Sequence, residues 1–89
     1  MKAKPGFVVR NIADEFILMP TGDNIGKFNG TVLLNEVSAF VWEKLQNPLS
    51  KEDLLEAVLD EYEVSRDTAA KDLDNLLETL RRYDVIADD

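Results

Sequence analysis

The stretch with the clearest chemical spacing is a glycine-containing loop at residues 22–28, which reads Gly-Asp-Asn-Ile-Gly-Lys-Phe. It superficially resembles a phosphate-binding loop, in which backbone amides and a lysine hold the phosphates of a nucleotide. However, the two glycines are one residue too close, and Phe28 stands where a serine or threonine would hold magnesium. No strand-to-helix transition surrounds the loop. We therefore interpret residues 21–29 as a wide hairpin loop made of turn-forming residues.

Few residues of this chain suit catalysis. It contains no histidine and no cysteine, which excludes disulfides, zinc sites of the Cys/His type, thiolate nucleophiles and imidazole acid–base catalysis. The carboxylates are spread over the surfaces of the expected helices and do not converge on one point. We therefore predict that the protein is not an enzyme, with no catalytic residues, no metal and no cofactor.

The net charge of −8 is concentrated in one half of the 89-residue chain. Residues 1–49 carry five Lys/Arg and five Asp/Glu, whereas residues 50–89 carry five Lys/Arg and thirteen Asp/Glu. Nucleic-acid binding depends on clustered cations, so the acidic half disfavours it. The acidity is consistent either with a solvated surface or with the attraction of a basic partner.

The N-terminus carries no targeting signal. Residues 1–6 contain two lysines and end in Pro5 and Gly6, with no apolar run typical of a signal peptide. No apolar stretch is long enough to span a membrane. We expect a cytoplasmic protein that forms a single domain over residues 1–89, with residues 1–6 as a mobile lead-in and no membrane partner.

The first third of the chain is predicted to form a sheet. Phe7–Ile12 and Glu15–Pro20 are typical of strands, and their two-residue link favours an antiparallel hairpin. Residues 30–34 are predicted to form a third strand, which runs directly into a helix.

The remainder is predicted to form three helices, at 36–46, from Ser50 to about residue 62, and from Ser65 to about Tyr83. Asn35 and Ser50 are expected N-caps, and Asp53 completes a near capping box with Ser50. Residues 85–86 are expected to fold back on the core. Trp42 falls beside the apolar stripe of its helix, which leaves partial exposure or a peripheral core contact as alternatives.

This order predicts an α+β fold, with a three-stranded antiparallel sheet followed by a three-helix, winged helix-turn-helix-like unit. A DNA-binding transcriptional regulator is therefore the alternative function. Its third helix would read DNA, yet that helix is rich in carboxylates.

The sequence resembles the PqqD family, whose members are also described as precursor-peptide recognition elements. The resemblance spans residues 7–86. It is carried by five segments in a fixed order: Val-Leu-Leu-Asn-Glu (32–36), Ala-Phe-Val-Trp (39–42), Leu-Ser-Lys-Glu-Asp-Leu (49–54), Glu-Tyr-Glu-Val (61–64) and Asp-Leu-Asp-Asn-Leu-Leu-Glu-Thr-Leu (72–80). The loop at 22–29 and Trp42 are more similar to the broad family than to the branch that serves pyrroloquinoline quinone.

The resemblance implies a peptide chaperone of natural-product biosynthesis. Members of the family bind the leader segment of a ribosomally made precursor peptide, which adds as a strand to the third strand and lies against the third helix. They present it to a modifying enzyme, often a radical S-adenosylmethionine (SAM)/SPASM-type maturase. The resemblance thus implies a leader peptide and a maturase as partners, and we expect a monomer or a weak homodimer.

Strand alternation and helical spacing then suggest the contact residues. Leu33 is expected to be exposed, whereas Val32 and Leu34 share the opposite face and are core candidates as much as binding candidates. The predicted peptide-binding set is Gly30, Thr31, Val32, Leu33, Leu34, Asp72, Leu76 and Thr79.

Overall fold

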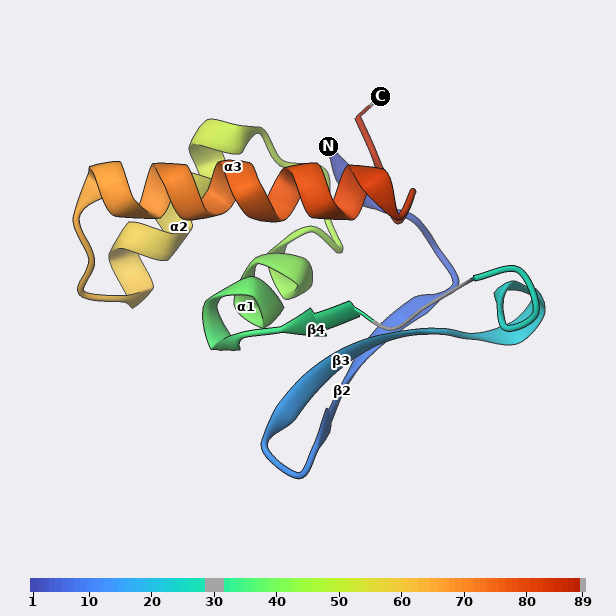
Figure 1. Ribbon diagram of the computed structural model, residues 1–89. Coiled ribbons are helices and arrows are strands. Elements are labelled where there is room, and N and C mark those ends of the chain that lie inside the picture. Colours follow the sequence, from blue (N-terminus) through green and yellow to red (C-terminus); the bar gives the residue numbers. More distant parts are fainter. Residues whose placement is uncertain (29–31, 89) are drawn as a thin grey trace.

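The computed structural model of the protein, which describes residues 1–28 and 32–88, confirms the predicted α+β architecture (Figure 1). A three-stranded antiparallel sheet precedes three helices. In chain order the elements are β1 (Lys2–Ala3), β2 (Phe7–Ile12), β3 (Glu15–Pro20), a 3-10 turn (Gly22–Asn24), β4 (Val32–Leu34), α1 (Glu36–Lys44), α2 (Lys51–Glu61), α3 (Arg66–Arg82) and β5 (Ile86–Ala87).

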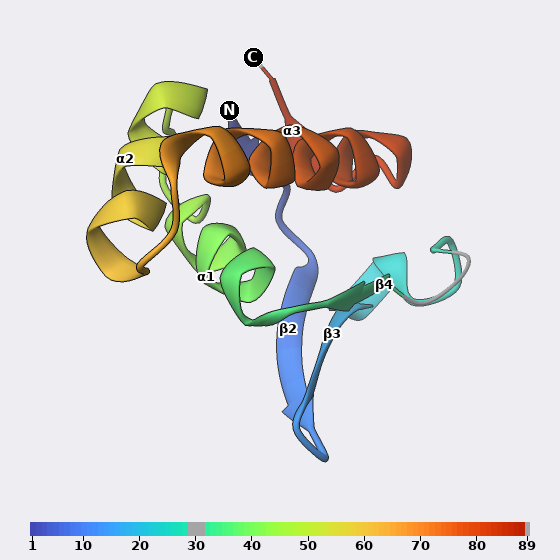
Figure 2. The ribbon, with the colours of Figure 1, turned by 60° about the vertical axis from the view of Figure 1, so that its left-hand side comes forward.

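The sheet has the order β2-β3-β4, so β4 is an edge strand. The hairpin of β2 and β3 has the predicted bounds and closes through Ala13 and Asp14, whose φ angles are 52° and 66°. Two successive positive φ angles define the turn whose twist matches that of paired strands. In Figure 2 this hairpin extends away from the helices, so that β4 is the strand nearest to the helical unit.

All three helices begin at capping side chains. The Asn35 side chain accepts a hydrogen bond from the Ser38 amide at 2.7 Å. Ser50 and Asp53 form a complete capping box, and Ser65 accepts from the Thr68 amide. The first helix ends two residues earlier than predicted, at Lys44, and the second is two residues shorter than predicted. These caps satisfy amides that the first turn leaves unpaired, so they fix where each helix starts.

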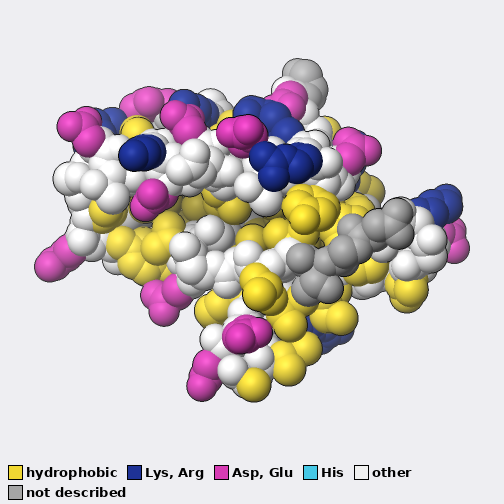
Figure 3. All heavy atoms as spheres, viewed as in Figure 1, with side chains coloured by type: hydrophobic (Ala, Val, Ile, Leu, Met, Phe, Trp, Pro, Cys, Tyr) yellow, Lys and Arg dark blue, Asp and Glu magenta, His cyan; other side chains and the backbone are white. Residues whose placement is uncertain are grey.

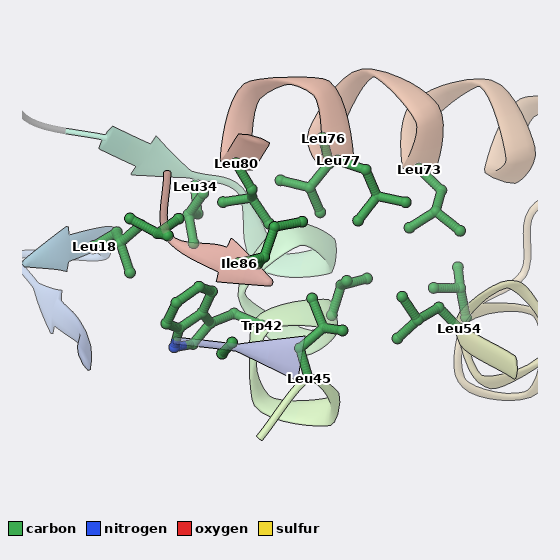
Figure 4. Close-up of a cluster of buried hydrophobic side chains, with 14 of the residues drawn as sticks. Leu18, Leu34, Trp42, Leu45, Leu54, Leu73, Leu76, Leu77, Leu80 and Ile86 are labelled. Atoms are coloured by element: carbon green, nitrogen blue, oxygen red, sulfur yellow. The ribbon is translucent and has the colours of Figure 1, made fainter. Parts of the chain in front are cut away.

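The core lies where α3 crosses α1 and the inner face of the sheet (Figure 4). Leu73, Leu77 and Leu80 of α3 are buried, as the helical spacing predicted. Trp42 is only 1% exposed and belongs to the same cluster. The expectation of a partly exposed or peripheral Trp42 is therefore wrong. The indole is covered because both chain ends pack over α1.

Residues 1–4 differ from the expected mobile lead-in. β1 pairs antiparallel with β5, and Ala3 is 7% exposed. The Ala3 amide donates to the Leu45 carbonyl at 2.8 Å, and the Lys4 amide donates to the Val85 carbonyl at 2.9 Å. Val85 and Ile86 are buried, which confirms that they fold back on the core. The lead-in is held because the returning C-terminal segment offers it a strand edge.

Removal of residues 1–4 is expected to destabilise the protein by about 2–4 kcal/mol, since it deletes backbone hydrogen bonds worth about 0.5–1.5 kcal/mol each. Urea unfolding of the truncated and full chains measures the difference. Lys2→Ala is the matched control, because its side chain is exposed, and it should change the free energy of unfolding by less than about 0.5 kcal/mol. A truncated chain as stable as the full one would instead support a mobile lead-in.

Candidate functional site

A groove of about 580 Å³ lies between β4, the first turn of α1 and one face of α3. Figure 3 shows hydrophobic side chains gathered in this hollow, beneath the charged outer surface of α3. Its walls come from three parts of the chain, namely the end of β4 with the start of α1, α2 with the α2–α3 turn, and α3 itself. The lining residues are Leu33, Leu34, Asn35, Val37, Ser38, Val41, Val58, Tyr62, Glu63, Val64, Ala69, Asp72, Leu73, Asn75, Leu76 and Thr79.

Five of the residues predicted from the sequence line this groove together: Leu33, Leu34, Asp72, Leu76 and Thr79. The three from α3 share one helical face, because residues separated by three or four positions lie above one another. Leu76 is buried, Thr79 is half-buried and Asp72 is exposed. The groove therefore has an apolar floor and a polar upper rim.

The other three predicted residues do not contribute side chains to the groove. Val32 is 4% exposed, belongs to the core and is absent from the lining. Its side chain takes the core position that the sequence left open beside a binding one, because it shares the inward face of β4 with Leu34. Gly30 and Thr31 lie outside the described residues.

β4 presents one paired and one open edge. It pairs antiparallel with β3 in the register Phe16↔Leu34, Ile17↔Leu33 and Leu18↔Val32, and no strand is paired with its other edge within the described chain. Leu33 is 62% exposed between two buried neighbours. Unpaired amides and carbonyls on such an edge are available to an incoming strand.

Sequence reasoning missed the end of the groove that the α2–α3 turn forms. Tyr62, Glu63 and Val64 line it, and a turn carries no periodicity that would point them at a neighbouring strand. Asn75 was also missed. The helical spacing did contain a signal for Asn75, because it lies three residues after Asp72 and four before Thr79 on the same face.

The turn end of the groove is electrostatically negative. Partial burial raises the pKa of the Tyr62 hydroxyl, and the negative charges of Glu36 and Glu61 raise it further, together with a hydrogen bond to Glu36. The hydroxyl therefore stays protonated at neutral pH.

Neither metal ligation nor a membrane-spanning helix is indicated by the described residues. Within residues 1–28 and 32–88, no three carboxylates lie in a group suited to holding a metal ion. In the same ranges, no helix has the length and hydrophobicity needed to cross a membrane. The groove combines the open edge of β4 with apolar and polar side chains, an arrangement suited to binding a ligand.

The fold and groove define a class of small α+β proteins in which an open edge strand faces a helix across an apolar trough. The chain belongs to the PqqD family, since the family model described as "Coenzyme PQQ synthesis protein D (PqqD)" matches residues 15–86. This confirms the resemblance seen in the sequence. No curated protein sequence matches the chain closely enough to add to this assignment.

Two solved structures are similar over most of the chain. The first, "TbiB1 in Complex with the TbiA(beta) Leader Peptide", is 25% identical with a TM-score of 0.74, and the match covers 100% of this chain and 98% of that one. The second, "Lasso peptide synthetase B1 complexed with the leader peptide", is 23% identical with a TM-score of 0.68, covering 91% and 89%. The second likeness supports the fold alone.

The different burial of two adjacent β4 residues gives a test of the site geometry. Leu33→Asp is expected to leave the free energy of unfolding within about 0.5 kcal/mol, since Leu33 is exposed. Leu34→Ala is expected to cost about 2–5 kcal/mol, because Leu34 is 7% exposed and its loss leaves a cavity. Urea unfolding of both variants measures this contrast, and equal losses would contradict the alternation of β4.

Proposed function

We propose that this protein binds the leader segment of a ribosomally made precursor peptide and presents it to a modifying enzyme. The observation that carries the proposal is the open edge of β4, which faces α3 across the groove. Membership of the PqqD family supports it. So does the similarity to TbiB1, whose structure contains a bound leader peptide.

The leader adds to β4 as a fourth strand of the sheet. Main-chain hydrogen bonds along a strand edge provide affinity for an extended peptide, whatever its side chains. β4 is suited to this role because the buried Val32 and Leu34 hold one face of the strand and the capped start of α1 holds its end. A rigid edge lowers the ordering cost of binding.

Side chains of the leader provide selectivity by entering the groove. Alternate residues of an added strand point to the same face of the sheet. Those on the inner face meet the apolar floor at Leu34, Leu73 and Leu76, under the rim formed by Asp72 and Thr79. Those on the outer face lie next to the exposed Leu33. We therefore assign peptide contact to Leu33, Leu34, Asp72, Leu76 and Thr79, and backbone pairing to residues 30–34.

The chain supplies recognition rather than catalysis, and a radical SAM/SPASM-type maturase performs the modification. In this proposal residues 1–89 act as one domain, because a single hydrophobic cluster extends from Ala3 to Ile86. The DNA-binding alternative is disfavoured. Arg66, Arg81 and Arg82 of α3 are each paired with a carboxylate, so few cations remain for phosphates.

Calorimetric titration with the short precursor peptide encoded beside the gene for this chain tests leader binding. We expect a one-to-one complex, and Leu33→Asp should weaken it at least about tenfold, since it removes an exposed apolar contact and adds charge at the strand edge. Asp60→Asn, on the exposed surface of α2, is the control and should bind like the original chain. Absence of binding at tens of micromolar would overturn the proposal.

Backbone N-methylation of the leader tests strand addition separately from side-chain contact. Each methyl group removes one amide donor while the side chain is kept. The amides of a strand point alternately toward and away from a neighbouring strand. Methylation of an amide that points toward β4 should therefore weaken binding about tenfold. Methylation of an amide that points away from β4 should have little effect. A loss without this period of two would contradict pairing with β4.

Delivery is tested by the rate at which the neighbouring maturase modifies the precursor peptide. We expect the rate to rise when this chain is added and to fall with Leu33→Asp, in parallel with the loss of leader binding. A maturase that works equally well without the chain would contradict delivery while leaving leader binding intact. Sedimentation with and without leader checks whether a weak homodimer forms through the same open edge.

A further inference from the structure

The charged side chains that line the groove are both carboxylates. Glu63 lies on the α2–α3 turn and Asp72 on α3, and both side chains are exposed at the groove. Neither makes an ion pair with any other residue in the part of the chain that the structure describes. Two negative charges without an ion-pair partner therefore face the same groove.

The cations of α3 do not balance these carboxylates. Arg66 is directed to Glu56 at 2.6 Å and to Glu52 at 3.4 Å, both on α2. Arg81 pairs with Asp88 at 3.0 Å, and this residue lies beyond β5. Arg82 pairs with Glu78 at 3.6 Å. Lys71 is the remaining cation of α3, and it does not line the groove. The positively charged side chains of α3 thus lie away from the groove.

Two further carboxylates lie close to the same end of the groove. Tyr62 lines the groove beside Glu63, and its pKa is raised mainly by burial and further by the negative charges of Glu36 and Glu61. In Figure 3, acidic side chains frame the part of the hollow that lies away from the grey residues. Charges arranged in this way favour a cationic side chain on the bound partner.

We infer that the leader bound in this groove carries a lysine or arginine just N-terminal to its strand-forming segment, and that Glu63 and Asp72 receive this side chain. The inference rests on the proposed function, because it names the chemistry of the peptide that occupies the same groove. We infer a cation on the peptide because the described lining of the groove contains two carboxylates and no lysine or arginine.

The position of the cation follows from the directions of the elements. β4 and α3 run in opposite directions along the groove (Figures 1 and 4). A strand that pairs antiparallel with β4, the commoner arrangement, therefore runs in the same direction as α3. Asp72 precedes Thr79 by seven residues, or about 10 Å of helix. About three residues of extended peptide span that distance, so the cation precedes the residue opposite Thr79 by about three positions.

Selection of random peptides displayed on phage, with the full-length protein as bait, tests this inference and requires no chosen leader sequence. We expect enriched peptides to contain an apolar segment of alternating pattern, preceded at a fixed offset of about three residues by Lys or Arg. Glu63→Gln and Asp72→Asn should each weaken a selected peptide roughly two- to fivefold at low ionic strength, and the difference should shrink as salt is added. The charge-reversed variant with Glu63→Lys and Asp72→Lys should enrich Asp or Glu at the same offset.

Asp60→Asn is the matched control, since it removes one exposed carboxylate that does not line the groove. It should leave the selected consensus unchanged. Circular dichroism verifies that each variant is folded before selection.

The possible failures are distinguishable. The inference would be overturned, with peptide binding left in place, if the enriched peptides carried no cation at a fixed offset. It would also be overturned if the preference for a cation persisted in both Glu63→Gln and Asp72→Asn. A cation that follows the apolar segment would overturn the antiparallel placement. No enrichment at all, or the same enrichment on Leu33→Asp, would overturn the proposed function and this inference with it.

Discussion

The structure depends on how β4 is anchored. Val32 and Leu34 enter the core from one face of the strand, and Asn35 immediately caps α1. The strand is therefore held by packing on one side of its plane and by a helix start at its end, and its outer edge has no partner within the described chain. A three-residue strand would be unstable without these constraints. With them, its edge remains open and rigid.

The position of α3 turns this edge into a groove. Its leucines pack in one cluster with residues of α1, α2 and the returning chain end, and this packing leaves the face with Asp72, Leu76 and Thr79 opposite β4. The pairing of β1 with β5 completes the core on the other side of α1 and covers Trp42. The binding face and the chain termini are thus linked through one hydrophobic cluster.

Much of the fold was predictable because local signals agreed. The bounds of β2 and β3, the capping by Asn35 and Ser50, and the exposure of Leu33 all follow from alternation, turn chemistry and caps. The short strands β1 and β5 were not predictable, since two residues carry no periodicity and each exists only because the other is adjacent. The burial of Trp42 escaped prediction for the same reason, because its cover comes from residues distant in sequence.

The sequence by itself determined the order of the elements, the acidic character of the second half and the resemblance to the PqqD family. These depend on residue types and near neighbours, which a linear pattern records. Only the tertiary structure decided that Leu33, Asp72 and Thr79 share a groove with the α2–α3 turn, and that Val32 does not. The physical reason is that the crossing of α3 over α1 and the edge of the sheet sets these distances, and that crossing is fixed by the packing of the whole core.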